Sequence, residues 1–136
     1  TGSGTTTTPA DNTKPQNTEG TQFMTYSITP SAKANWLRIE SRAHVSASAV
    51  VAAIMALHQD STADALSVSW RNINAADAAH DAHIDHMMLA GTTSSTSFKI
   101  RVGGSSASTI YFNNNSGGPF FNGTFNSYMR ITEILG

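Results

Sequence analysis

The chain has 136 residues, a net charge of −1 and an isoelectric point near 6.5. This length fits a single domain, and the near-neutral charge argues against nucleic acid or an anionic membrane as a partner. Cysteine is absent, which excludes disulfides and thiolate chemistry, and no apolar run approaches the ~18 residues that would predict membrane insertion.

The apolar content predicts a small hydrophobic core. Leu, Ile, Val and Phe total only 25 residues, whereas Ser and Thr total 34. The 18 alanines add apolar side chains that bury little area. Because small cores are often stabilised by subunit association, the composition is a first indication of an oligomer.

The sequence predicts that the chain has two parts, a lead-in segment and a folded domain. Residues 1–20 hold Thr, Gly, Pro and Asn and almost nothing apolar, which predicts an extended linker or lead-in segment. The structured domain is expected over residues 21–136. It begins with "QFMTYSIT", where Met24, Tyr26 and Ile28 alternate with polar residues as in a strand that ends before a proline.

Three segments follow that differ in clarity. "NWLRIESRAHVS" alternates cleanly and predicts a half-buried strand with Trp36 on the polar, partly exposed face. "ASAVVAAIMALHQD" fits both a helix and a strand that is apolar on both faces, and periodicity does not decide between them. In "ALSVSW", Leu66, Val68 and Trp70 alternate with serines, which predicts a strand with Trp70 in the core. In "NWLRIESRAHVS", the apolar residues expected on one face are Leu37, Ile39, Ala43 and Val45.

The last third contains the plainest strand signals. "TSFKIRVGG", "STIYFNNN" and "NSYMRITEILG" are separated by stretches rich in Gly, Asn and Ser. Short strands between such turns predict an all-β sandwich or barrel. In the final strand Glu133 shares a face with Met129 and Ile131. Either a β-bulge shifts the pattern, which is the commoner cause, or Glu133 points inward towards a partner.

Five segments together resemble one known family. These are "PADNTKPQNTEGTQFM", "ITPSAKANWLRIE", "LHQDSTADAL", "MLAGTTSSTSFKIRVGG" and "RITEI". They are similar to the C-terminal domains of tail-fibre and related virion structural proteins of tailed bacteriophages and prophages, over roughly residues 9–136.

The resemblance implies a fold, an assembly and a place. The fold is a jelly-roll β-sandwich like that of the tumour-necrosis-factor-like proteins, assembled as a homotrimer at the end of a fibre on the virion. It implies the rest of the fibre or virion as a partner and no known catalytic residues. No cofactor is expected. It also favours the strand reading of "AVVAAIMALHQD", facing the other sheet or a neighbouring subunit.

The stretch "AAHDAHIDHMM" carries three histidines at intervals of three, His80, His83 and His86. In a strand they alternate between faces and do not share one ion, whereas in a helical turn His80 and His83 are neighbours. Around a threefold axis, one histidine per subunit would give a His₃ set that zinc accepts. The alternatives are interface histidines that repel when protonated and weaken a trimer below about pH 6, or plain exposed histidines.

The loop "NNNSGGPFFNGTFNSY" is the candidate ligand site. Aromatic faces beside amide groups suit sugar rings or apolar protein pockets. The alternative is that Phe120 and Phe121 seal the sandwich or a trimer seam while the asparagines make turns. The predicted ligand-binding residues are Asn113, Asn114, Asn115, Phe120, Phe121 and Asn122.

The expected function is non-enzymatic attachment to a glycan or protein on the host surface, made effective by three sites on one trimer. The alternative is a purely architectural trimerisation cap or capsid-decorating domain that has no ligand of its own.

Overall fold

The computed structural model describes residues 1–136, and its regular structure is almost entirely antiparallel β-strand. The strands are β1 (Gly2–Gly4), β2 (Thr21–Ile28), β3 (Trp36–Ala47), β4 (Val51–Gln59), β5 (Ser67–Ile73), β6 (His80–Leu89), β7 (Thr96–Gly104), β8 (Ile110–Phe112), β9 (Asn114–Asn115), β10 (Gly118–Pro119) and β11 (Tyr128–Ile134). The one helical segment is the short 3-10 turn η1 (Phe120–Gly123). None of the helical structure is long and apolar enough to cross a membrane.

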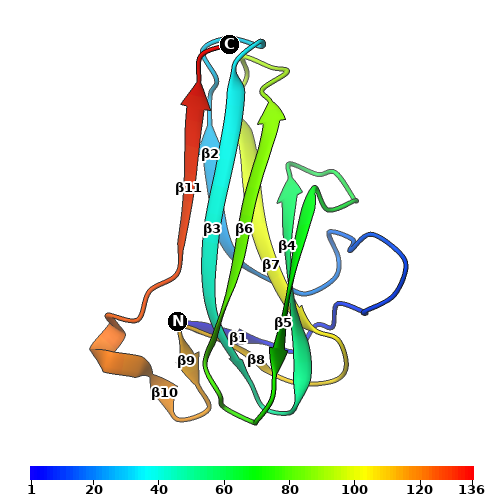
Figure 1. Ribbon diagram of the computed structural model, residues 1–136, viewed down its shortest axis with the longest axis vertical. Helices are drawn as coiled ribbons and strands as arrows, with labels where there is room; N and C mark the ends of the chain where they lie inside the picture. Colours follow the sequence, from blue (N-terminus) through cyan, green and yellow to red (C-terminus); the bar gives the residue numbers. More distant parts are fainter.

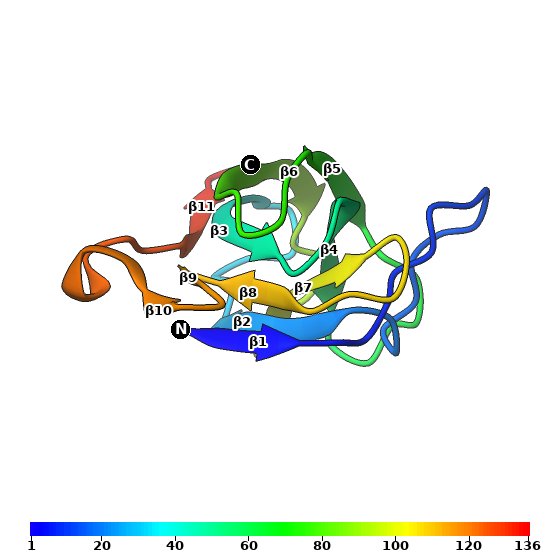
Figure 2. The same ribbon diagram turned by 90° about the horizontal axis from the view of Figure 1, so that it is seen from below.

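Two antiparallel sheets form the body of the molecule (Figures 1 and 2). The long strand β3 is the centre of the first sheet, with β6 along one edge and β11 followed by β8 along the other. Strand β1 extends this sheet beyond β8. The second sheet has the order β2-β7-β4-β5. The all-β prediction is therefore confirmed, and the arrangement is consistent with a β-sandwich.

The core lies between the sheets and follows from the alternation in the sequence. The four residues predicted to share the apolar face of β3, Leu37, Ile39, Ala43 and Val45, are all at most 1% exposed. They belong to one cluster of 18 buried residues that includes the inward side chains of β4 and β7. The largest of these facing side chains are Met55, Leu57, Phe98, Ile100 and Val102.

The ambiguous segment is a strand that is buried on both faces. Met55 and Leu57 of β4 point into the core, while Ile54 and His58 point to the opposite face and are still buried. The segment 9–15 closes over the Ile54 side of this outer face. Small alanines between these residues leave room for that close cover.

The lead-in segment packs on the chain's own sheets. Strand β1 pairs with β8, and the buried Thr8 donates its backbone N–H to the carbonyl of Gly104 at 3.0 Å. Further along, the N–H of Ala65 donates to the carbonyl of Pro15 at 2.9 Å. The lead-in segment is therefore part of the folded domain: β1 extends the first sheet, and residues 8–15 are attached to the second.

Strand β5 corrects one prediction. Val68 and Trp70 alternate with serines as expected, but Trp70 is paired with Ile54 on the outer side of the second sheet and is 57% exposed. The prediction of a core Trp70 is therefore wrong, because alternation does not reveal which face of an edge strand meets the core. Trp36 is 42% exposed, so the prediction of partial exposure is confirmed.

The final strand decides between the two explanations for Glu133. β11 pairs with β3 without a break from Tyr128 to Ile134, so there is no bulge, and Glu133 lies opposite the buried Leu37 on the inward side, as the second alternative predicted. Glu133 accepts hydrogen bonds at the end of the sandwich from the side-chain amide of Asn35 at 2.7 Å and from the N–H of Ser31 at 2.7 Å. These two bonds, Asn35 first, lower the pKa of Glu133 from its ordinary value.

Candidate functional site

Residues 113–127, here called the arm, leave the first sheet between β8 and β11 and project to one side of the molecule (Figures 1 and 2). At its base, the side-chain oxygen of Asn113 accepts hydrogen bonds from the N–H of Ser127 at 2.9 Å and from its hydroxyl at 2.6 Å. The short hairpin of β9 and β10 follows. The two ends of the arm are joined to each other by these bonds and to His44 of β3, whose carbonyl accepts from the N–H of Asn113 at 3.0 Å and whose N–H donates to the hydroxyl of Ser127 at 2.9 Å.

Hydrogen bonds within the fold use the side chains of two of the four predicted asparagine ligands, Asn113 and Asn115, and only the backbone of a third, Asn114, whose side-chain oxygen is buried without a partner. Asn115 accepts from the N–H of Gly117 at 2.9 Å, as in a tight turn. The backbone carbonyl of Asn114 accepts from the hydroxyl of Ser46 at 2.9 Å, which ties β9 to β3. Asn122 differs from them, since it is exposed and has a positive φ of 52°. Of the four asparagines, Asn122 alone is fully presented to solvent.

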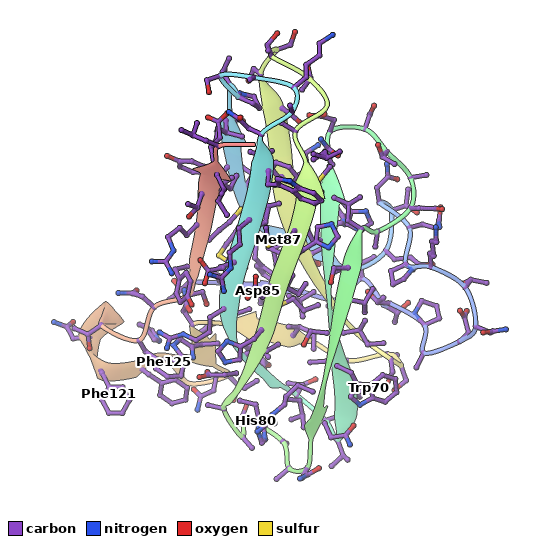
Figure 3. All side chains as sticks on the ribbon, turned by 45° about the horizontal axis from the view of Figure 1, so that its top comes forward. Trp70, His80, Asp85, Met87, Phe121 and Phe125 are labelled. Carbon is purple, nitrogen blue, oxygen red and sulfur yellow. The ribbon has the colours of Figure 1, made fainter.

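Three phenylalanines form an aromatic cluster on the arm. Phe125 stacks on His44 of β3 with ring centroids 3.8 Å apart, and Phe120 meets Phe125 edge to face at 5.5 Å. Phe121 lies at the tip and is 76% exposed, with a positive φ of 48° that non-glycine residues rarely adopt. Figure 3 shows Phe121 beyond Phe125 on the outer side of the arm. Such strain is characteristic of binding positions.

The predicted histidine cluster is spread along one strand. All three histidines lie in β6, and no helical turn forms at His80 and His83. The register places His80 opposite Val45 and His86 opposite Ile39, on the inward side, and leaves the exposed His83 on the outer side. Six residues of strand separate His80 from His86 by about 20 Å. No group of three or more His, Asp or Glu in the structure is placed to hold a metal ion.

The outer face of β6, β3 and β11, here called the β3 face, carries side chains in regular rows. At one end, Leu89, Trp36 and Ile134 lie side by side across the three strands, and all three are partly exposed. The next row adds the exposed Met87 of β6, which Figure 3 places beside Asp85. Four apolar side chains therefore form an uncovered patch on this face.

A ladder of ion pairs crosses the middle of the β3 face. Arg38 donates two hydrogen bonds to the carboxylate of Asp85, at 3.0 and 2.6 Å. One carboxylate oxygen of Glu40 lies 3.1 Å from the guanidinium of Arg130, and the other lies 3.5 Å from the guanidinium of Arg38. The hydrogen bond from Arg38 lowers the pKa of Asp85. Beyond the ladder, the guanidinium of Arg42 lies 5.3 Å from the ring centre of Tyr128.

One buried histidine outside the predicted cluster has no hydrogen-bond partner. His58 of β4 is 1% exposed, and neither ring nitrogen finds a partner in the structure. Burial lowers its pKa, and the nearby positive charges of Arg101 and Lys99 on β7 lower it further. The fold therefore favours the neutral imidazole.

The one pocket of the molecule lies where sequence reasoning did not place a site. Its volume is about 280 Å³, and it opens between the segment 9–15 and the outer face of β4 and β5. Trp70 lines it, and the misassignment of that residue to the core concealed the site. The alternation of Val68 and Trp70 with serines carried no signal for the site, because it does not show which face of an edge strand meets the core.

Comparison with known proteins adds no relative. No protein-family model matches the chain, and no curated protein matches it. The resemblance to virion domains therefore rests on the sequence segments quoted above, and the function is inferred from the chain's own residues.

Proposed function

We propose that the domain is a non-catalytic attachment domain of a tailed-phage fibre or related virion appendage. It works as a homotrimer that binds a glycan or protein on the host surface. The phage context and the virion location rest on the sequence resemblance. The assembly and the attachment surface are supported by separate observations on the fold, the β3 face and the arm.

The strand pairing supports a jelly roll. The antiparallel pairs β1–β8, β2–β7, β3–β6 and β4–β5 are nested within one another along the chain. Such nesting arises when a long antiparallel hairpin folds over into two sheets, which is the jelly-roll arrangement. Strands β8 and β11 pair with the same edge of β3, β8 with residues 45–47 and β11 with residues 36–42.

The β3 face supports a subunit contact. It combines an uncovered apolar patch with charged side chains that already pair within the chain, so covering it would bury few unpaired charges. The chain buries only 32 of its 136 residues, and a contact over this face would add to that small core. Threefold repetition would then present three arms on one particle.

The exposure of Phe121 at the tip of the arm is the observation that carries the attachment function. Phe121 touches Phe120 and Phe125 only at long range, with ring centroids 6.2 and 6.3 Å apart, and a strained backbone leaves 76% of it exposed, so most of its apolar surface is not buried by the isolated fold. Covered by a receptor, the same ring would bury area and stack on a sugar or fill an apolar pocket. Three such weak contacts on one trimer would act together by multivalency.

Adsorption of the labelled protein to a panel of bacterial strains tests this proposal. Phe121→Ala is expected to lower adsorption to a susceptible strain roughly tenfold, while Tyr26→Ala, which removes an exposed aromatic ring on β2 of the second sheet, leaves it unchanged. Equal adsorption of both variants would exclude the arm as the attachment surface. Trimers that adsorb to no strain would favour the architectural cap.

A further inference from the structure

The first half of strand β5 turns its apolar side chains to solvent. Val68 and Trp70 face outward and are 46% and 57% exposed, while Ser67 and Ser69 face the interior side together with the fully buried Ile73 at the end of the strand. If this half of the strand buried its apolar residues, the orientation would be the opposite. Inverted patterning of this kind, and exposed apolar groups that gather at one place, are typical of binding surfaces.

The lead-in segment converts this exposed strip into a pocket. Ile54, Val68 and Trp70 line it from the outer face of the second sheet, and Pro9 and Pro15 line it from the lead-in segment. Asp11, Thr13 and Lys14 of the same segment add polar groups to the lining. The volume of about 280 Å³ lies just below the usual range for ligand pockets, about 300–1,000 Å³, and suits a single ring.

The indole of Trp70 is fixed in place before any ligand binds. Its Nε1–H donates to the side-chain oxygen of Asn72, two residues along β5, at 2.7 Å. This bond uses the polar edge of the ring and leaves its face free for stacking. A side chain that is already ordered loses little entropy on binding, which favours even a weak contact.

The charge in the lining selects against anions. Lys14 pairs with Asp64 at 3.3 Å, so its positive charge is compensated. Asp11 accepts two bonds from Thr13 on one carboxylate oxygen, Oδ1, at 2.8 and 2.6 Å. These bonds lower the pKa of Asp11, which keeps it ionised, and its second oxygen is free to accept hydrogen bonds from a ligand.

We propose that this pocket binds one ring of a neutral sugar. The apolar C–H face of a pyranose would stack on Trp70, and its hydroxyl groups would donate to Asp11. Such a site adds a ligand class and a second location to the attachment function proposed above, and it rests on that function only for its biological use. Figure 3 shows Trp70 on the flank opposite Phe121, so the two sites are separate.

The pocket also remains open in the proposed trimer. It lies on the outer face of the second sheet, whereas the β3 face belongs to the first. Three copies would give three sugar sites on one particle. Millimolar affinity at each site would therefore still support attachment to a surface dense in glycan.

Fluorescence titration of a single-tryptophan variant tests the site directly. Trp36→Phe leaves Trp70 as the sole tryptophan, since the chain has two. The probes are glucose, galactose, mannose, N-acetylglucosamine and N-acetylgalactosamine, with N-acetylneuraminic acid as the anionic comparison. At least one neutral sugar is expected to change the emission saturably, and to show saturation transfer by NMR with the unmodified protein. Both readouts report single sites and do not require a trimer.

Substitutions then assign the binding to the pocket. Trp70→Ala is expected to weaken the NMR-detected binding roughly tenfold, Trp70→Phe to weaken it less, and Tyr26→Ala to leave it unchanged. Circular dichroism checks that each variant is folded. The proposal is overturned if no neutral sugar binds, if only the anionic sugar binds, or if folded Trp70→Ala binds as the unmodified protein does.

The two proposals fail in different ways. Loss of bacterial adsorption in Phe121→Ala without sugar binding at Trp70 would retain the attachment function and overturn the sugar site. Sugar binding that depends on Trp70, in a protein that adsorbs to no bacterium, would retain the sugar site and contradict the attachment function.

Discussion

Replacement of Trp36 by Ala tests whether the β3 face is a subunit contact. Trp36 lies in the middle of the apolar row and is 42% exposed. A tryptophan side chain has up to about 250 Å² of surface, so about 100 Å² of Trp36 is available for a partner. At about 25 cal/mol per Å², covering it contributes about 2.5 kcal/mol per subunit, or roughly 60-fold in an association constant.

Sedimentation velocity over a range of protein concentrations measures this effect. The unmodified protein is expected to sediment as a trimer, and Trp36→Ala to dissociate to monomers at concentrations where the unmodified protein stays assembled. Tyr26→Ala removes a ring of similar exposure on β2 of the second sheet and serves as the matched control. A trimer that is equally stable with Ala at position 36 would refute the assignment of the contact to this face.

Three further predictions concern the fold itself. Burial lowers the pKa of His58 in the folded protein, so the imidazole binds a proton more readily in the unfolded chain. The contribution of neutral His58 to folding stability is therefore fully present above the ordinary pKa of about 6.5 and is lost as the pH falls below it. Calorimetry between pH 5 and 7.5 should show this loss, and His58→Leu should reduce it; an unchanged slope would contradict the reasoning. Phe98→Ala removes the largest fully buried side chain and should cost about 3–5 kcal/mol in urea unfolding, and a cost below about 1 kcal/mol would mean that the core is misplaced. Gly103→Ala would place a methyl group 2.7 Å from the nitrogen of Thr8 and should release the lead-in segment, making it more sensitive to proteinase K; unchanged cleavage would show that the segment is held elsewhere.

The sequence predicted those strands whose alternation coincides with burial. In β3 the apolar face is the core face, so Leu37 and Ile39 were placed correctly. In β5 the same kind of alternation misleads, because Trp70 lies on the outer face and only tertiary structure shows which side of an edge strand is covered. Periodicity reports that two faces differ, and it does not report which of them faces the core.

The candidate site was predicted only in part, because much of it depends on tertiary structure that local sequence patterns do not show. The position of the arm follows from a loop rich in Gly, Asn and aromatic residues, whereas the exposure of Phe121 does not, because the same residues also fit rings that seal the sandwich. The hydrogen bonds that engage Asn113 and Asn115 depend on backbone geometry that the residue types alone do not specify. The pocket beside Trp70 needs residues about sixty positions apart in the chain, and no local pattern brings them together. Glu133 likewise finds its partner Asn35 only through the pairing of β11 with β3.

The solution mass at neutral pH, measured by light scattering, tests the central claim most directly. Assembly through the β3 face predicts a particle of about three times the chain mass of 14.4 kDa. A stable monomer of 14.4 kDa at micromolar concentration would contradict the trimeric attachment domain and leave the exposed row around Trp36 without a partner.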